Sequence, residues 1–151
     1  MNQEIERKFL LKALPPHFEQ MTGVPVAQGY LAIEPRGNQV RLRQMGETAF
    51  LTVKRGEELV RAEHEIELSA PQFAALWPLT AGRRLTKQRY KTPYAGRIIE
   101  IDVYGGSNHG LVVAEVEFDS EEAAHAFVPP EWFAEEISER PEYSNRNLAR
   151  E

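Results

Sequence analysis

The stretch EIERKFLL, residues 4–11, decides how the rest of the chain is interpreted. If it forms a β-strand, alternate side chains point to opposite faces, and one face carries Glu4, Glu6 and Lys8. Such a face is either a solvated surface or one wall of a charged tunnel that holds metal ions and a polyanion. The other strands decide between these two interpretations, because alternating charges are common by chance in a charged chain.

The composition sets broad limits on the class of protein. The chain has 151 residues, of which 42% are hydrophobic and 27% are charged, as expected for a single soluble globular domain spanning residues 1–151. The absence of cysteine excludes a disulfide framework, a thiolate metal site and a cysteine nucleophile. We expect a cytoplasmic protein, because no apolar run is long enough to span a membrane and no secretory signal pattern opens the chain. The net charge of −5 argues against a general nucleic-acid-binding protein.

Alternation of polar and apolar residues predicts further strands, mostly linked by tight turns. Their expected ranges are 26–34, 39–44, 49–55, 59–68, 85–91, 97–104 and 111–118. Short helices are expected at 69–77, at about 119–127 and at about 143–150, and the tail from residue 129 is otherwise expected to be irregular. An antiparallel sheet can remove its edges by closing on itself. The predicted fold is therefore mainly β (α+β): an eight-stranded antiparallel closed β-barrel with a few helices packed outside it.

Charges on the predicted strands are sorted by sign. The strands at 39–44, 49–55 and 85–91 are basic on their charged face, whereas those at 97–104 and 111–118 are acidic. A solvated face that pairs its charges across strands has no reason to separate them in this way. A site for a metal-chelated polyanion does, because carboxylates suit hard divalent cations and Arg or Lys suit phosphate oxygens. The pattern alone leaves both interpretations open.

The motifs EIERKF, VRLR, LTVK, EHEIE, KQR, EIDVY, VAEVE and YSN follow one another in this order along the chain. Any one of them is a weak signal, but the ordered set covers nearly the whole sequence. It resembles the CYTH superfamily, also called the triphosphate tunnel metalloenzymes, and is most similar to the small, single-domain bacterial members. The resemblance implies an eight-stranded antiparallel barrel that encloses a tunnel, in agreement with the pattern of strands.

The resemblance also implies roles for individual residues. The expected ligands of Mg²⁺ or Mn²⁺ are Glu4, Glu6, Asp102, Glu115 and Glu117. The expected triphosphate-binding residues are Lys8, Arg41, Arg43, Lys54, Lys87 and Arg89. Glu63 and Glu65 are expected to order these bases or to bind a second metal ion.

Activation of the attacking water is open to two interpretations. Tyr30 and Lys87 occupy the positions of a Tyr and a Lys that are proposed, in some members of the family, to create the nucleophile together. A lysine beside other cations loses its proton more easily, which makes this arrangement physically reasonable. In the alternative, Tyr30 only packs against the tunnel wall and a water on the metal ion reacts.

The implied function is divalent-metal-dependent hydrolysis of inorganic triphosphate (tripolyphosphate) to diphosphate and phosphate, with a small polyanionic substrate and neither nucleic acid nor a membrane as partner. One alternative is an enzyme acting on an organic triphosphate: a nucleoside triphosphatase, a thiamine triphosphatase or a class IV adenylyl cyclase. Another is a non-catalytic polyphosphate-binding module, against which the acidic residues argue, because a pure anion-binding protein would gain nothing from them. The apolar outer surface expected of such a barrel is compatible with a homodimer.

Overall fold

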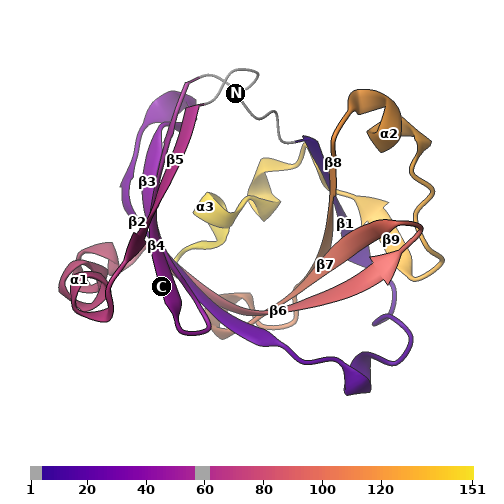
Figure 1. Ribbon diagram of the computed structural model, residues 1–151, viewed down its shortest axis with the longest axis horizontal. Helices are drawn as coiled ribbons and strands as arrows, with labels where there is room; N and C mark the ends of the chain where they lie inside the picture. The colour runs from indigo at the N-terminus through magenta and orange to yellow at the C-terminus, as the bar shows by residue number, and fades with distance from the viewer. Residues whose placement is uncertain (1–4, 57–61) are drawn as a thin grey trace.

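The computed structural model describes residues 5–56 and 62–151 and shows one strongly curled sheet, with the C-terminal helix inside its curve rather than outside it as predicted (Figure 1). The strands are β1 (Ile5–Leu11), β2 (Val24–Ile33), β3 (Gln39–Met45), β4 (Thr48–Arg55), β5 (Ala62–Leu68), β6 (Arg84–Tyr94), β7 (Arg97–Tyr104), β8 (Val112–Phe118) and β9 (Phe133–Glu136). The α-helices are α1 (Ala70–Leu76), α2 (Glu121–Ala126) and α3 (Asn145–Leu148). Short 3-10 segments lie at Phe18–Gln20, Pro35–Gly37, Trp77–Thr80, Gly106–Asn108 and Pro141–Tyr143.

The sheet is antiparallel and has nine strands, in the order β5-β4-β3-β2-β6-β7-β8-β1-β9. The predicted mainly β fold is confirmed, but the predicted closed eight-stranded barrel is wrong, because no pairing within the described residues joins β5 to the other end of the sheet. The physical reason is β9, a strand in a segment that was expected to be irregular. It pairs with β1 through Phe9 with Glu136 and Leu11 with Phe133. It thereby occupies the edge of β1 that a closed barrel would need for β5.

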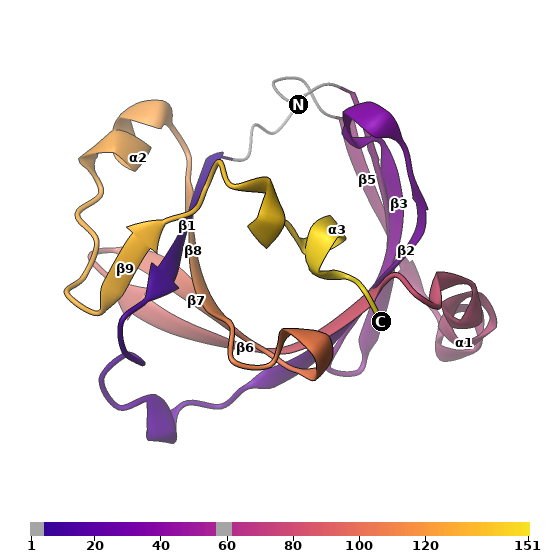
Figure 2. The ribbon, with the colours of Figure 1, turned by 180° about the vertical axis from the view of Figure 1, so that it is seen from behind.

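The C-terminal segment lies inside the curve of the sheet. Figures 1 and 2 view the molecule from opposite directions, and both show α3 within the curve of the sheet, facing its concave side. Leu148 and Ala149 are buried there in one apolar cluster with Tyr30, Leu85 and Tyr104. The segment is fixed at its end because the backbone N–H groups of Arg84 and Glu151 each donate to the other's carbonyl, at 2.9 and 3.1 Å.

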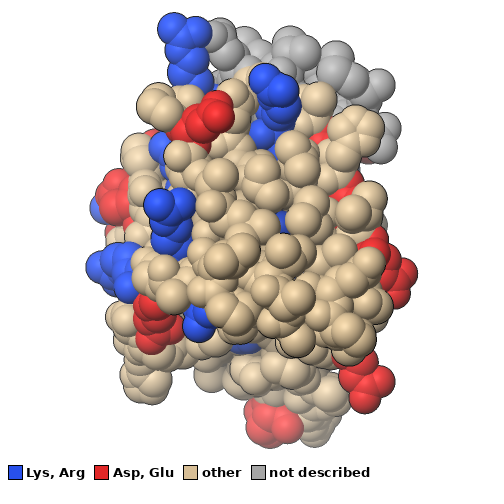
Figure 3. Space-filling view, turned by 90° about the vertical axis from the view of Figure 1, so that its left-hand side faces the viewer, with Lys and Arg blue, Asp and Glu red and all other residues tan. Residues whose placement is uncertain are grey.

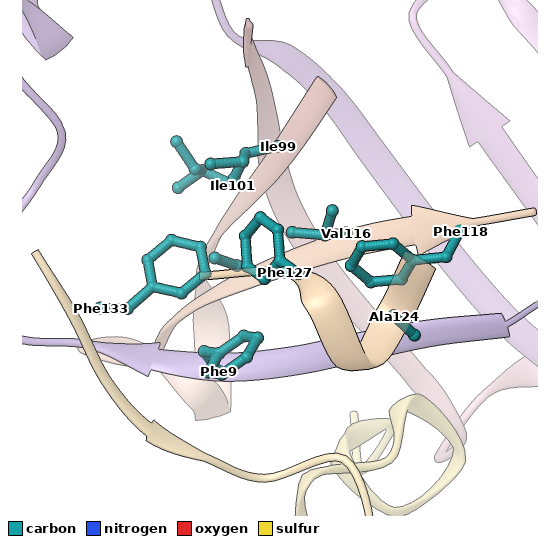
Figure 4. Close-up of a cluster of buried hydrophobic side chains, with 9 residues drawn as sticks. Phe9, Ile99, Ile101, Val116, Phe118, Ala124, Phe127 and Phe133 are labelled. Atoms are coloured by element: carbon teal, nitrogen blue, oxygen red, sulfur yellow. The ribbon is translucent and has the colours of Figure 1, made fainter. Parts of the chain in front are cut away.

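Most apolar side chains of the strands lie on the outer, convex face. Near β1, β7 and β8, Phe127 packs with ring-centroid distances of 6.3 Å to Phe9, 5.4 Å to Phe118 and 6.2 Å to Phe133 (Figure 4). On the other side of the molecule, α1 places Phe73 in a cluster with Leu42 and Ala49. Because these covered apolar faces point outwards, the opposite, charged faces of the same strands point into the curve.

The two predicted helices that cover the sheet begin where their sequences indicated. Ser69 forms a capping box with Gln72 at the start of α1, and the Ser120 side chain accepts a hydrogen bond from the N–H of Ala123 in α2.

No helix within residues 5–56 and 62–151 is long and apolar enough to cross a membrane. On the side where β3, β5 and α1 lie, uncharged side chains fill the centre of the surface and charged ones lie mostly towards its margins (Figure 3).

Arg7 holds three elements together on the outer face. Its guanidinium donates to the Glu136 carboxylate at 3.1 and 2.6 Å and to the Ala124 carbonyl at 2.8 Å, and it lies 5.1 Å from the centroid of the Phe9 ring. It therefore links β1 to β9 and to the C-terminal end of α2.

We expect Arg7→Met to lower the free energy of unfolding by about 1.5–3 kcal/mol, the usual contribution of hydrogen bonds to a charged group. Urea denaturation followed by circular dichroism measures the loss. Arg140→Met is the matched control, because the Arg140 side chain contacts Glu135, Glu142 and the ring of Tyr143 on the surface, and its unfolding curve should not move. Equal stability of Arg7→Met and the wild type would contradict this role.

Candidate active site

Strand register gathers the charged side chains on the concave face. Directly paired residues share a face, and the pairs include Tyr30 with Arg41, Arg89 with Asp102, and Lys8 with Glu115. Tyr30 contacts the C-terminal segment inside the curve, which identifies this face as the concave one. Within the described residues, register places the following predicted residues on it: Glu6, Lys8, Arg41, Arg43, Lys54, Glu63, Glu65, Lys87, Arg89, Asp102, Glu115 and Glu117. Glu4 lies outside the described residues.

Acidic side chains of β1 and β8 form one side of the site. Glu6 pairs with Glu117 in the register and lies close to Glu115, and Lys8 Nζ is 3.8 Å from Glu115 Oε1. Partial desolvation of the Glu6 carboxylate, together with the charge of Glu115, raises the pKa of Glu6 to about 7. The side chain is still reached by solvent. The charges of Lys8 and Lys54 oppose this rise but do not cancel it.

This acidic group suits a hard divalent cation. Carboxylate oxygens are the ligands that Mg²⁺ and Mn²⁺ prefer, and a cation between Glu6 and Glu115 would favour their ionised forms. Within residues 5–56 and 62–151, no three carboxylates or imidazoles gather closely enough to form a metal site by themselves. Glu4, which the sequence predicts as a further ligand beside Glu6, is not among those residues.

Asp102 is a buried counterion for two bases of β6. Its carboxylate accepts hydrogen bonds from Lys87 Nζ at 2.8 Å and from Arg89 Nε and Nη2 at 2.8 and 2.9 Å, and only 1% of its side chain is exposed. Burial acts to raise the pKa of Asp102, but Arg89 and Lys87 outweigh it and lower the pKa to about 2. Arg89 also pairs with Glu100 at 2.9 Å. The sequence predicts Asp102 as a metal ligand. In the structure, both of its carboxylate oxygens accept hydrogen bonds from the Lys87 and Arg89 side chains.

Arg41 and Arg43 of β3 form the basic side of the site. The Nε atoms of both are buried and find no hydrogen-bond partner among the described residues. Arg43 Nη2 lies 3.9 Å from Glu65 Oε2, and burial, followed by the charges of Arg41 and Arg89, lowers the pKa of Arg43. Buried donors without partners are costly, which indicates that this surface is shaped for an acceptor-rich ligand such as a phosphate.

Two glutamates of β5 lie beside the bases of β3 and β4. Glu65 accepts a hydrogen bond from Thr52 Oγ1 at 3.0 Å and lies near Arg43, and Glu63 lies 3.9 Å from Lys54 Nζ. The sequence leaves two roles open for Glu63 and Glu65, the ordering of these bases and the binding of a second metal ion, and both remain predictions. The glutamates belong to an edge strand, so they also line the open side of the sheet.

Tyr30 lies at the floor of the concave face and is only 1% exposed. Its hydroxyl oxygen accepts a hydrogen bond from Gln28 Nε2 at 2.8 Å, and Gln28 is fully buried. Burial raises the pKa of Tyr30, and Arg41, Gln28 and Arg43 oppose this rise. At neutral pH the side chain is therefore a hydroxyl with a proton to give rather than a phenolate.

The C-terminal segment contacts two parts of the site. Tyr104 Oη donates to Asn145 Oδ1 at 2.7 Å, and the ring of Tyr104 lies 5.3 Å from Lys87 Nζ. Lys8 Nζ donates to the Tyr143 carbonyl at 2.6 Å. The segment thus lies beside both Lys8 and Lys87, two residues that the sequence predicts to bind the substrate.

Gln28 and Tyr104 are part of this face but were not predicted as site residues. Both are uncharged, and the site was predicted from alternating charges. The register of the hairpins could have revealed them, because Tyr104 pairs with Lys87 and Gln28 pairs with Arg43.

The sequence matches the CYTH domain over residues 2–150. It is 46% identical to an inorganic triphosphatase of Nitrosomonas europaea over 148 residues, which cover 97% of this chain and 96% of that protein. It is 32% identical to an inorganic triphosphatase of Acetivibrio thermocellus over 152 residues, covering 99% of this chain and 95% of that one.

Similarity extends to a solved structure. The crystal structure of an inorganic triphosphatase superposes with a TM-score of 0.77 at 44% identity, and the match covers 99% of this chain and 95% of that one. The family match spans nearly the whole sequence and agrees with the arrangement of charged strands described above. The chain therefore belongs to the CYTH domain family.

Proposed function

We propose that this protein hydrolyses inorganic triphosphate to diphosphate and phosphate on the concave face, with a divalent metal ion. The observation that carries the proposal is the division of this face into two parts. Buried guanidinium Nε atoms without hydrogen-bond partners among the described residues lie on β3, and carboxylates whose charge adds to the effect of burial in raising the pKa of Glu6 lie on β1 and β8. The relatives that match nearly the full length of the chain are inorganic triphosphatases, which supports this substrate.

The basic residues bind the triphosphate in this proposal. Phosphate oxygens accept hydrogen bonds from guanidinium and ammonium groups, and neutralising these oxygens lowers the barrier to attack at phosphorus. The binding set is Lys8, Arg41, Arg43, Lys54, Lys87 and Arg89. Lys8 exchanges its contact with the Tyr143 carbonyl for a phosphate oxygen when the substrate enters.

The acidic residues hold the metal ion, with Glu4, Glu6, Glu115 and Glu117 as the ligand set. A bound Mg²⁺ or Mn²⁺ supplies charge that offsets the phosphate oxygens. We assign Asp102 a different role from these four. It fixes the positions of Lys87 and Arg89 through the hydrogen bonds at 2.8 and 2.9 Å.

Tyr30 and Lys87 remove a proton from the attacking water in this mechanism. The Tyr30 hydroxyl gives its proton to the amine of Lys87 and takes one from the water. Burial lowers the pKa of Lys87 despite the opposing effect of Asp102, which favours a neutral amine more than at an exposed lysine. No covalent nucleophile is required, because positioning and electrostatic stabilisation supply most of the rate in phosphoryl transfer.

Phosphate release tests the proposed function directly. Tripolyphosphate, ATP and thiamine triphosphate are compared at equal concentration with Mg²⁺, with Mn²⁺ and with EDTA. We expect fast release from tripolyphosphate that requires metal and is abolished by EDTA. Faster release from ATP or thiamine triphosphate would replace the substrate assignment, and tight binding of tripolyphosphate without release would identify a binding protein instead.

Tyr30→Phe separates proton removal from packing. The ring stays in its apolar cluster while the hydroxyl is lost, so we expect kcat to fall by about 100-fold with little change in KM, as for loss of a general acid–base group. Steady-state kinetics at saturating tripolyphosphate and metal measure the effect. A normal kcat would show that Tyr30 only packs against the wall of the site.

A further inference from the structure

Gln28 contributes a buried acceptor to a surface of donors. Its side chain is fully buried on β2, and its amide oxygen Oε1 has no hydrogen-bond partner among the described residues. Its amide nitrogen is held by Tyr30 Oη at 2.8 Å, which fixes the direction of the amide. Such an unpaired acceptor is costly in a folded protein and calls for an explanation in function.

The neighbours of Gln28 define what can bind to this oxygen. Gln28 pairs with Arg43 on β3 and with Leu85 on β6, two residues from Lys87, so it lies between the two groups of predicted phosphate-binding bases. Ionised phosphate oxygens have no hydrogen to donate and cannot satisfy Oε1. A water molecule can, because it donates one hydrogen to Oε1 and keeps a lone pair free to point at the substrate.

We propose that Gln28 is a further catalytic residue, which holds and orients the attacking water. This inference rests on the proposed function. The water donates one hydrogen to Gln28 Oε1. Gln28 Nε2 keeps its hydrogen bond to Tyr30, and the Tyr30 hydroxyl takes the other hydrogen of the water as a proton. One amide thus sets the distance and direction between the water and its proton acceptor.

The step is balanced without any charge on Gln28. The water oxygen forms a bond to the terminal phosphorus, and the bond from that phosphorus to the bridging oxygen breaks, with its electron pair passing to diphosphate. The proton lost by the water passes to the Tyr30–Lys87 pair. Gln28 neither gains nor loses a proton, so its contribution lies in orientation.

Gln28→Met tests the proposal, because it keeps the length of the side chain and removes both polar atoms. We expect kcat for tripolyphosphate to fall by about 100-fold, the effect of a misplaced reacting group, and KM to stay within about threefold. Binding of tripolyphosphate in EDTA, measured by calorimetry, should match the wild type. An unchanged kcat, or a loss confined to KM, would overturn the proposal.

Gln39→Met is the matched control for burying a methionine in place of a glutamine. Gln39 is buried on the same face, and its side chain donates to the Gly37 carbonyl at 3.4 Å, so this variant should keep its kcat. Gln28→Glu retains an acceptor at the position of Oε1, and its kcat should exceed that of Gln28→Met. If Gln28→Glu were as slow as Gln28→Met, the acceptor would have no role and the inference would fail.

A double variant distinguishes catalysis from support of the fold. If Gln28 and Tyr30 act as a unit, adding Gln28→Met to Tyr30→Phe should lower kcat little further, because effects within a catalytic unit are not additive. Full additivity of the two losses would contradict the inference. Hydrolysis of tripolyphosphate by the wild type in the same assay tests the proposed function separately. The function and the role of Gln28 can therefore fail independently of each other.

Discussion

Asp102→Asn is expected to lower the free energy of unfolding by about 3–5 kcal/mol and kcat by about 100-fold. The carboxylate is the buried counterion of both Lys87 and Arg89. Asparagine has one acceptor oxygen in place of two, and its amide hydrogens would face a cation. The Lys87 amine and the Arg89 guanidinium would then remain close together and buried without a counterion, which is the situation that makes breaking a buried ion pair costly.

The pH dependence of stability provides a second measure of the same interaction. The pKa of Asp102 is lowered from 3.8 to about 2 in the folded protein. A carboxyl group with a lowered pKa stabilises the fold above its unfolded pKa, and this stabilisation is lost as the pH falls through the folded pKa. The difference in unfolding free energy between wild type and Asp102→Asn should therefore be largest above about pH 4 and shrink towards pH 2.

Metal titration separates the two roles that Asp102 could have. If Asp102 only positions Lys87 and Arg89, kcat of Asp102→Asn stays low at saturating Mg²⁺ and the Mg²⁺ concentration for half-maximal activity is unchanged. If Asp102 is a metal ligand, as the sequence predicted, more Mg²⁺ is needed and high Mg²⁺ restores activity. Glu135→Gln, which disturbs only an exposed pair with Arg140, is the control and should change neither stability nor kinetics.

Glu115→Gln is expected to reduce kcat/KM at moderate Mg²⁺ by more than about 100-fold, since even partners of metal ligands contribute about 10–100-fold. Glu115 lies between Lys8 and Glu6 on the acidic side of the face. The variant loses a charged ligand while keeping the shape of the side chain. Activity as a function of Mg²⁺ concentration measures the loss, with Glu122→Gln on the exposed surface of α2 as the control. An unchanged Mg²⁺ requirement would exclude Glu115 as a ligand.

The same variant should change the titration of Glu6. Partial removal of water and the charge of Glu115 hold the pKa of Glu6 at about 7, so the loss of that charge should lower it. Carboxyl carbon chemical shifts of the metal-free protein would follow the change by NMR. In the wild type, protons compete with metal for Glu6, and the Mg²⁺ concentration for half-maximal activity should rise as the pH falls through about 7.

The charged side of the site was predictable from the sequence because it depends on alternation within strands. Arg41 and Arg43, or Glu115 and Glu117, must share a face in any strand. The outward direction of the apolar faces followed from the need of residues such as Phe9 and Phe118 for a covering layer. Charge and period two were sufficient for these predictions.

Whether the sheet closes into a barrel or stays open was not predictable in the same way. It depends on which strand reaches the free edge of β1, and the four residues of β9, Phe133–Glu136, carry no alternation that would identify a strand. A short segment that is half apolar and half acidic looks like a loop. Its pairing with β1 is decided by tertiary packing, above all by the burial of Phe133 against Phe9 and Phe127.

The pairing of Asp102 could have been predicted from turn chemistry. Ala95 and Gly96 both have positive φ, as in the two-residue turns that join antiparallel strands, and they place Tyr94 opposite Arg97. Counting back from this turn sets Arg89 opposite Asp102. For Gln28, register gives the position opposite Arg43 but no role, because a neutral side chain in a strand has no charge pattern and the burial of its Oε1 atom depends on tertiary packing.

The position of β1 in the sheet also affects how the chain folds as it is synthesised. The strands from β2 to β5 form consecutive hairpins, whereas β1 pairs with β8 and β9 across more than 100 residues, a separation that slows folding. At typical rates of synthesis, β1 waits roughly 5–20 s for its partners. Its alternating glutamates and lysine would keep this waiting strand from adhering to other chains. The charges that form the site thus also protect the nascent protein from aggregation.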